Sequence, residues 1–209
     1  MRVKQVFAHY EREDQWTDGF KHCPFCTTHL VLAESGHRLR PTCPSCGFVQ
    51  HRNPAPTVSI LVVDGDRVLL GKRGGNPGKG TWSLPSGYIE YEDDFLTTAI
   101  REAKEETGLD IEICSIINVV SSFVSPRFHF LGIYLVARIV GGELVAGDDL
   151  EAVDWFPMSG PLPEMGFQED VHIIELYAKK GFEGFPIDKK QTYEFSPEIA
   201  DGHRPPALG

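Results

Sequence analysis

The sequence has no long apolar segment. None of its apolar runs approaches the roughly 20 residues that a membrane-spanning helix needs, and its first residues, MRVKQVFAHYEREDQW, lack the apolar core of a signal peptide. Both absences argue against a membrane protein and indicate a cytoplasmic location. The 209 residues, 41% of them hydrophobic and 24% charged, have instead the composition of a globular protein with one main domain and an accessory piece.

Positive charge is also scarce. Lys and Arg together number 20 against 30 Asp and Glu, which gives a net charge of −10. Residues 1–56 hold seven of the basic and five of the acidic residues, so the remainder carries −12. Nucleic acid is bound largely through its phosphates, and an acidic chain is therefore an unfavourable partner for it. A small phosphate-containing substrate stays compatible with this charge, because metal ions can bridge two negative groups.

A phosphate-binding loop of the Walker A type is missing as well. Residues 74–82, GGNPGKGTW, include the Gly-Lys pair of such a loop. However, Arg73 stands where its first glycine belongs, and Gly80 follows Lys79 in place of Ser or Thr. The glycine-rich segment is therefore not a P-loop.

Cysteine is rare, and four of the five cysteines are paired in the sequence. These four form two Cys-x-x-Cys pairs separated by sixteen residues: Cys23, Cys26, Cys43 and Cys46. Four thiolates at this spacing predict a zinc ribbon over residues 21–50 and a structural Zn²⁺, because they complete a tetrahedron without an open position for water. Two disulfides are the alternative, disfavoured by the absent secretory signal and the odd fifth cysteine. That cysteine, Cys114, lies in an apolar stretch and is expected to be buried.

The most informative stretch runs from residue 87 to 109, GYIEYEDDFLTTAIREAKEETGL. It predicts a helix from Asp94 to Thr107. One face of this helix is apolar: Leu96, Ala99, Ile100 and Ala103. The neighbouring face carries three carboxylates: Glu102, Glu105 and Glu106. Two of them, Glu102 and Glu106, lie one turn apart and repel each other unless a divalent cation such as Mg²⁺ or Mn²⁺ binds between them. A solvated acidic face is the alternative for the helix considered alone.

Together with its flanks, this stretch resembles the Nudix box. The box has the form Gly, five residues, Glu, seven residues, Arg-Glu-U, one residue, Glu-Glu, one residue, Gly-U, where U is aliphatic. The matching residues are Gly87, Arg101, Glu102, Ala103, Glu105, Glu106, Gly108 and Leu109. Asp93 stands where the family has Glu, and Ser86 precedes Gly87 where the family usually has a second glycine. The cysteine pairs resemble the zinc ribbon of the NADH-pyrophosphatase-like and ADP-ribose-pyrophosphatase-like branch of the family.

The resemblance implies an α/β fold, the Nudix α/β/α sandwich with a mixed sheet, preceded by the zinc ribbon. We expect these segments: an N-terminal arm at 1–20, the ribbon at 21–50, a stiff linker at 51–56, the Nudix domain at 57–180 and an irregular tail at 181–209. The arm shows no periodicity and is expected to pack loosely. Within the domain, hydrophobic patterning predicts these elements: a β-hairpin over 57–73 that turns at Asp64–Gly65, strands at 110–124 and 128–140, a short strand ending at Pro157, and a helix at 169–180.

The resemblance also implies Mg²⁺- or Mn²⁺-dependent hydrolysis of the pyrophosphate bond of a nucleoside diphosphate linked to another group. By the family pattern, Glu102 and Glu106 bind the metal together with the backbone carbonyl of Ser86. Glu105 is a further ligand or the base that activates water. Arg101 orients the carboxylates.

Further candidates lie outside the box. In many members of the Nudix family an acid of a late loop helps to activate water, and the resemblance makes Asp148, Asp149 and Glu151 the candidates here. Glu151 is also a candidate for substrate binding. Arg127, between two predicted strands, is a candidate for contact with a phosphate or base, with a solvated turn as the alternative. Three aromatic residues alternate along one strand and are expected in the core rather than against a base: Phe128, Phe130 and Tyr134.

The zinc-ribbon arrangement favours a dinucleotide substrate, and the family implies a homodimer. Members active on NADH typically carry an SQPWPFPxS array, which is absent from SSFVSPRFHFLG at 121–132. The sequence therefore favours ADP-ribose or FAD at least as much as NADH. Two other functions stay open: a regulator that senses a nucleotide without hydrolysing it, which would be expected to have lost metal-binding carboxylates, and an enzyme that acts on RNA and grips it with the ribbon.

Overall fold

The structure, a computed structural model, describes residues 3–10, 19–126, 128–180 and 184–187. Its strands are β1 (Val6–Ala8), β2 (Val31–Ser35), β3 (Arg38–Thr42), β4 (Ala55–Asp64), β5 (Arg67–Arg73), β6 (Trp82–Ser83), β7 (Ser86–Tyr88), β8 (Leu109–Ser125), β9 (Phe128–Gly142), β10 (Leu150–Pro157) and β11 (Phe185–Pro186). Its helices are α1 (Phe95–Thr107) and α2 (Gln168–Lys180). Neither helix is long and apolar enough to cross a membrane.

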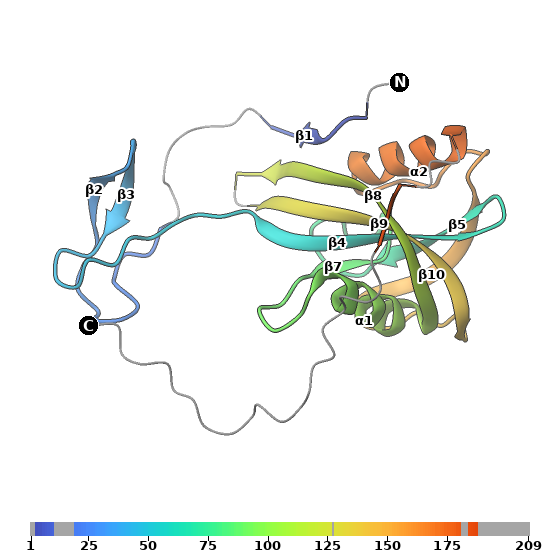
Figure 1. Cartoon of the computed structure of the whole chain (residues 1–209), viewed down its shortest axis with the longest axis horizontal. Helices are drawn as coiled ribbons and strands as arrows, with labels where there is room; N and C mark the ends of the chain where they lie inside the picture. Colours follow the sequence, from blue (N-terminus) through green and yellow to red (C-terminus); the bar gives the residue numbers. More distant parts are fainter. Residues whose placement is uncertain (1–2, 11–18, 127, 181–183, 188–209) are drawn as a thin grey trace.

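A large mixed sheet forms the body of the described residues (Figure 1). Its strands follow the order β1-β8-β9-β4-β5-β10, while β11 pairs with β8, β6 with β5 and β7 with β4. The neighbours β4 and β9 run parallel, whereas β8 and β9 run antiparallel. The two strands β2 and β3 form a separate small sheet in the cysteine-rich segment, which lies to one side of the body in Figure 1.

Each helix covers one face of the large sheet (Figure 1). Along β4 the side chains alternate, so that Ile60 packs in the core with Ala99 of α1 and Leu61 packs in the opposite core with Ile173 of α2. A strand buried on both faces needs apolar residues at consecutive positions, which explains the run SILVV at 59–63. The predicted α/β/α arrangement with a mixed sheet is therefore confirmed.

Most of the predicted elements are present at the expected places. The two strands of the hairpin are paired through Val63–Val68 and Asp64–Arg67, so its turn consists of Gly65 and Asp66, one residue later than predicted. The strands β8 and β9, the short strand β10 and both helices agree with the sequence patterns within a few residues.

Two expectations about burial are wrong. Residues 6–8 of the arm form β1, which pairs in parallel with β8, and Phe7 is only 2% exposed in the core beside α2. A strand of three residues is too short to show a period, so β1 could not be predicted from hydrophobic patterning. Cys114 is exposed, because its neighbours Ile113 and Ser115 point into the protein and alternate residues of a strand face opposite sides.

The ends of the predicted segments are described only in part. β4 begins at Ala55, inside the predicted linker. In the predicted tail, Phe185 and Pro186 pair with β8, whereas residues 181–183 and 188–209 lie outside the described residues, as do residues 11–18 of the arm.

Candidate active site

The acidic helix begins and ends where its sequence predicts. The Asp94 carboxylate caps the N-terminus of α1 by accepting hydrogen bonds from the backbone N–H groups of Leu96 and Thr97, at 2.8 and 3.0 Å. Gly108 ends the helix in the left-handed conformation, with φ of 72°, and its N–H donates to the Lys104 carbonyl. These local signals fix the register of the five charged residues between them.

The buried side of α1 includes two of the carboxylates. Glu106 is only 3% exposed and Glu102 is also buried, next to the fully buried Ala99 and Ala103. Ile100, expected on the apolar face, is 47% exposed, so that part of the prediction is wrong. The side of the helix that faces the sheet is therefore centred closer to the acids than the apolar pattern indicated.

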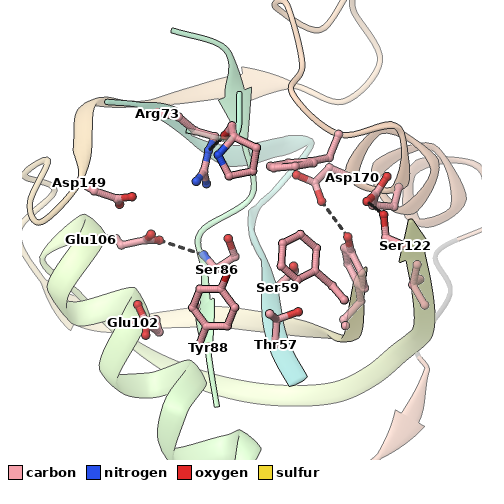
Figure 2. Close-up of a pocket in the computed structure, with 18 of the residues that line it drawn as sticks. Thr57, Ser59, Arg73, Ser86, Tyr88, Glu102, Glu106, Ser122, Asp149 and Asp170 are labelled. Atoms are coloured by element: carbon pink, nitrogen blue, oxygen red, sulfur yellow. Dashed lines mark hydrogen bonds between the residues drawn. The ribbon is translucent and has the colours of Figure 1, made fainter. Parts of the chain in front are cut away.

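Glu106 combines burial with a backbone contact. Its Oε2 accepts a hydrogen bond from the N–H of Ser86 at 2.9 Å (Figure 2). The pKa of Glu106 is raised to about 8, mainly by burial and also by the nearby charges of Glu102 and Asp149, while Ser86 and Arg73 act in the opposite direction. Burial likewise raises the pKa of Glu102. A bound cation would stabilise the ionised form of both side chains.

Strand β7 brings backbone atoms to these acids. A Cβ at Gly87 would lie 2.0 Å from Cδ of Glu102, so any larger residue there would displace the carboxylate. Ile60 N–H donates to the Pro85 carbonyl, and Ser86 is the partner of Ser59 at the next position of the same ladder. Backbone groups at alternate positions of an antiparallel pair point away from the partner strand. The carbonyl of Ser86 therefore points to the same side as its N–H, toward Glu106.

Arg101 contacts three carboxylates. Its Nη1 lies 2.9 Å from Oε1 of Glu102 and 3.0 Å from Oε2 of Glu105, and its Nε lies 3.4 Å from Oδ2 of Asp93. Asp93 thus occupies the place of the family glutamate and reaches the arginine. Glu105 is exposed and does not line the cavity described next.

A cavity of about 250 Å³ lies between the acidic helix, the sheet and the N-terminus of α2 (Figure 2). Glu102 and Glu106 line it from α1, and Asp148 and Asp149 line it from the loop before β10. Glu151 does not line the cavity, and its carboxylate lies 3.9 Å from Nζ of Lys72. Of the late-loop candidates, the structure thus brings two to the acidic cluster. The remaining candidate, Arg127, lies outside the described residues.

Sequence reasoning missed one cationic residue. Among the described residues that line the cavity, Arg73 is the single Lys or Arg. Its Nε donates to the Pro77 carbonyl at 2.7 Å, and its guanidinium carbon lies 5.4 Å from the centre of the Phe167 ring. The available signal was its place between an apolar strand and a glycine-rich loop.

Glu90, which follows β7, also lines the cavity and was missed. So were two acids of α2, Glu169 and Asp170. They lie in the first turn of α2, are 3% and 2% exposed, and line the cavity. Asp170 lies at the end opposite α1 (Figure 2). Asp170 accepts hydrogen bonds from the N–H of Leu84 and the hydroxyl of Tyr134, both at 3.0 Å. Burial raises the pKa of Asp170 to about 7. Glu169 instead contacts the hydroxyl of Ser122 and, at 3.4 Å, Nε2 of His9.

The three alternating aromatic residues differ in their surroundings. Tyr134 is buried, as predicted, although it also lines the cavity. Phe130 is half-buried and also lines the cavity, while Phe128 is exposed, so the core prediction is wrong for Phe128. Tyr88 of β7 lies beside Phe130, with ring centres 6.0 Å apart. The cavity lining therefore combines aromatic rings with carboxylates.

The four paired cysteines converge outside this cavity. Their sulfur atoms all lie within 4.8 Å of one another, with separations of 3.4, 3.5 and 3.6 Å for three of the pairs. These distances are well above the roughly 2.05 Å of a disulfide. They are close to the roughly 3.8 Å between sulfurs that bind one zinc ion tetrahedrally at about 2.3 Å. The donor set thus fits Zn²⁺.

Comparisons with known proteins agree with this geometry. A family model described as NUDIX domain matches residues 53–177. An ADP-ribose pyrophosphatase of Methanocaldococcus jannaschii is 36% identical over 128 residues, which cover 61% of this chain and 75% of that protein. The NAD-capped RNA hydrolase NudC of Pseudomonas aeruginosa is 29% identical over 165 residues, 78% of this chain and 57% of that protein. The chain thus spans little more than half the length of the NudC relatives that it matches.

Solved structures share the fold. The crystal structure of a NUDIX hydrolase from Nitrosomonas europaea superposes with a TM-score of 0.70 and 25% sequence identity, covering 80% of this chain and 95% of that one. A UDP-X diphosphatase superposes with a TM-score of 0.54 at 17% identity, which concerns the fold alone. The family match covers more than half of the sequence and includes the acidic helix and both of its flanks. The chain belongs to the NUDIX domain family and is a Nudix hydrolase, as its sequence predicted.

Proposed function

We propose that this Nudix hydrolase cleaves the pyrophosphate bond of ADP-ribose or a related NAD-like dinucleotide with the help of Mg²⁺ or Mn²⁺. The observation that carries the proposal is the convergence of two buried box carboxylates, two late-loop carboxylates and one arginine on a single cavity. The similarity to an ADP-ribose pyrophosphatase supports the choice of substrate. A sensor without catalytic activity would have no need to keep repelling acids buried together.

Hard oxygen donors suit Mg²⁺ or Mn²⁺. Glu102, Glu106 and the carbonyl of Ser86 would hold the cation. Glu106 contacts the N–H of Ser86, Glu102 lies against Gly87, and the strand register directs the carbonyl and the N–H of Ser86 to the same side. When bound, such a cation neutralises phosphate oxygens and acidifies water. Arg101 holds Glu102 in place through its 2.9 Å contact and keeps the exposed Glu105 away from the cavity.

Arg73 would bind the diphosphate of the substrate. A guanidinium can donate two parallel hydrogen bonds to phosphate oxygens. The contacts with the Pro77 carbonyl and the Phe167 ring fix its orientation before the substrate arrives, so that little side-chain entropy is lost on binding. Among the described residues that line the cavity, Arg73 is also the single Lys or Arg, so its positive charge is the one that can offset the charge of the acids.

An acid of the late loop would take the proton from the attacking water. Asp148 and Asp149 line the cavity, whereas Glu105 and Glu151 do not. A general base must lie within hydrogen-bond reach of the water that it deprotonates. The geometry therefore favours Asp148 or Asp149 over Glu105 for this role.

The test is a substrate panel with and without Mg²⁺ or Mn²⁺: ADP-ribose, NADH, FAD, diadenosine polyphosphates and nucleoside triphosphates. We expect hydrolysis of ADP-ribose or an NAD-like dinucleotide that depends on the cation. Asp149→Asn and Asp148→Asn identify the base, because the variant that lacks it should lose turnover with little change in KM. Binding of these nucleotides without hydrolysis would contradict the proposal and favour the nucleotide-sensing regulator.

The role of Arg73 has a matched control in the sequence. Arg73→Gln should lower kcat/KM about 10- to 100-fold, because hydrogen bonds to charged groups contribute about 1.5–3 kcal/mol. Lys72→Gln changes the neighbouring residue, whose side chain points to Glu151 and not into the cavity. Equal kinetics for both variants would rule out the phosphate contact.

A second candidate is hydrolysis of the NAD cap of RNA. The similarity to the NudC proteins, which carry that name, extends over 78% of this chain. Two aromatic residues, Phe20 at the end of the arm and Phe25 in the ribbon, are 58% and 78% exposed, and exposed aromatic rings can stack on unpaired bases. Under this alternative the ribbon would bind the RNA that follows the cap.

A further inference from the structure

A three-residue segment, Leu84–Ser86, is held from three directions. The N–H of Leu84 donates to Oδ2 of Asp170 in α2, at 3.0 Å. The carbonyl of Pro85 accepts from the N–H of Ile60 in β4, at 2.9 Å. The N–H of Ser86 donates to Oε2 of Glu106 in α1, at 2.9 Å. Carboxylates from helices on opposite faces of the sheet thus hold the two ends of the segment. Figure 2 shows the contact between Glu106 and Ser86.

Asp170 is fixed more firmly than an ordinary surface acid. It is 2% exposed, and each carboxylate oxygen has a partner, with Oδ1 accepting from the Tyr134 hydroxyl at 3.0 Å. Leu84, which it contacts, is itself 1% exposed. A buried carboxyl group is costly unless its hydrogen bonds are satisfied. This arrangement leaves Asp170 little freedom to move relative to the segment.

We propose that Asp170 is a positioning residue for the cation site. By holding the N–H of Leu84, it fixes the Pro85–Ser86 peptide and keeps the Ser86 carbonyl directed toward Glu106. The inference rests on the proposed function in taking that carbonyl as a cation ligand. Asp170 itself lies at the other end of the cavity and acts through the backbone rather than through contact with the cation.

The neighbouring acid provides a matched control. Glu169 is buried to the same degree, belongs to the same turn of α2 and lines the same cavity. Its partners are Ser122 and His9, neither of which belongs to the segment. Removing either acid would loosen α2 in general. Only the removal of Asp170 would break the hydrogen bond to the N–H of Leu84.

The experiment measures Mn²⁺ binding to the full-length protein without substrate, by the paramagnetic resonance signal of free Mn²⁺. Asp170→Ala should weaken Mn²⁺ binding about tenfold or more, the typical effect of removing a group that orients a metal ligand. Asp170→Asn keeps an oxygen for Leu84 and an amide for Tyr134, and should bind within about twofold of the unmodified protein. Glu169→Ala should also leave the Mn²⁺ affinity within about twofold.

Circular dichroism shows whether each variant is folded. If Asp170→Ala does not fold, Asp170→Ser replaces it, since its side chain is too short to reach Leu84 yet remains polar. Wild-type Mn²⁺ affinity in a folded Asp170→Ala or Asp170→Ser protein overturns the inference, and so does equal weakening by Glu169→Ala. Failure of the proposed function looks different: Glu106→Gln would then leave Mn²⁺ binding unchanged.

Discussion

At the scale of single residues, the site depends on acids that are held in unfavourable surroundings. Glu106 is almost fully buried, accepts only one backbone hydrogen bond and lies near the charges of Glu102 and Asp149. Its pKa of about 8 means that the folded chain without Mg²⁺ or Mn²⁺ binds a proton there at neutral pH. A divalent cation can replace that proton and remove the repulsion. Burial thus favours the binding of a positive charge at Glu106, either a proton or a divalent cation.

This gives the stability a defined pH dependence. In buffers free of Mg²⁺ and Mn²⁺, the folded chain keeps the Glu106 proton up to about pH 8, whereas the unfolded chain releases it near pH 4.5. Between these values the folded state binds more protons, so the free energy of unfolding should fall as the pH rises. Urea denaturation at pH 5, 6, 7 and 8 measures the slope.

Glu106→Gln should flatten this slope, and Mg²⁺ should raise the midpoint more at pH 8 than at pH 5, because it competes with the proton. Glu105→Gln, at an exposed position of the same helix, serves as the control and should keep the slope. Identical slopes in the two variants would show that Glu106 does not carry the effect.

At the scale of elements, the features encoded locally were predictable. The cap residues and the 3.6-residue period lie within the α1 sequence, so its limits could be predicted from Asp94 and Gly108. The side of α1 that faces the sheet could not be predicted: Ile100 is exposed, whereas Glu102 and Glu106 are buried. The side that faces the sheet depends on tertiary contacts with β7, and the helical period of the sequence carries no information about those contacts.

The late-loop acids and the α2 acids show the same limit for the site. Asp148 and Asp149 were among three candidates that could not be distinguished from the sequence. The pairing of β10 with β5 brings both of them to the cavity lined by α1, and it leaves Glu151 beside Lys72. Asp170 gave no signal at all, because acids are common in the first turn of any helix. Its importance comes from a contact with Leu84, 86 positions earlier in the chain.

Strand β1 is the element with the least sequence signal and a clear expected effect on stability. Phe7 is 2% exposed and packs in the core beside α2, while its neighbour Val6 is 56% exposed. Phe7→Ala should lower the free energy of unfolding by about 3–5 kcal/mol, and Val6→Ala by less than about 0.5 kcal/mol. Urea denaturation measures both, and similar values for the two variants would mean that β1 does not contribute as a packed strand.

The ribbon should depend on its metal. Residues 21–50 bury only a few side chains around Cys23, Leu30 and Cys43, too few for a stable core without a cross-link or metal. Elemental analysis should find one zinc per chain, and a strong chelator should increase amide hydrogen exchange in the ribbon before the Nudix domain is affected. Absence of zinc from the purified protein, or uniform exchange in both parts, would contradict the assignment.

At the scale of the whole molecule, charge bears on the choice between a small dinucleotide and capped RNA. The ribbon segment 21–50 holds three basic residues and one acidic residue, a balance of +2. Four zinc-bound thiolates carry a net charge of −2 with their Zn²⁺, which cancels this balance. The chain as a whole has a formal net charge of −10 before the metal is counted. Contact with an RNA backbone would therefore release few counterions and contribute little affinity.

Salt dependence tests this argument directly. A protein that neutralises six or more phosphates loses about 10³-fold or more in affinity between 50 and 200 mM salt. We expect the KM for a capped RNA to change less than about tenfold over this range, and kcat/KM for the RNA not to exceed the value for the free NAD-like dinucleotide, which serves as the control. Low KM values for the RNA at 50 mM salt that rise steeply with salt would instead support cap hydrolysis. In that case the exposed ring of Phe25 is the first group to replace, since stacking would then carry the affinity that charge does not.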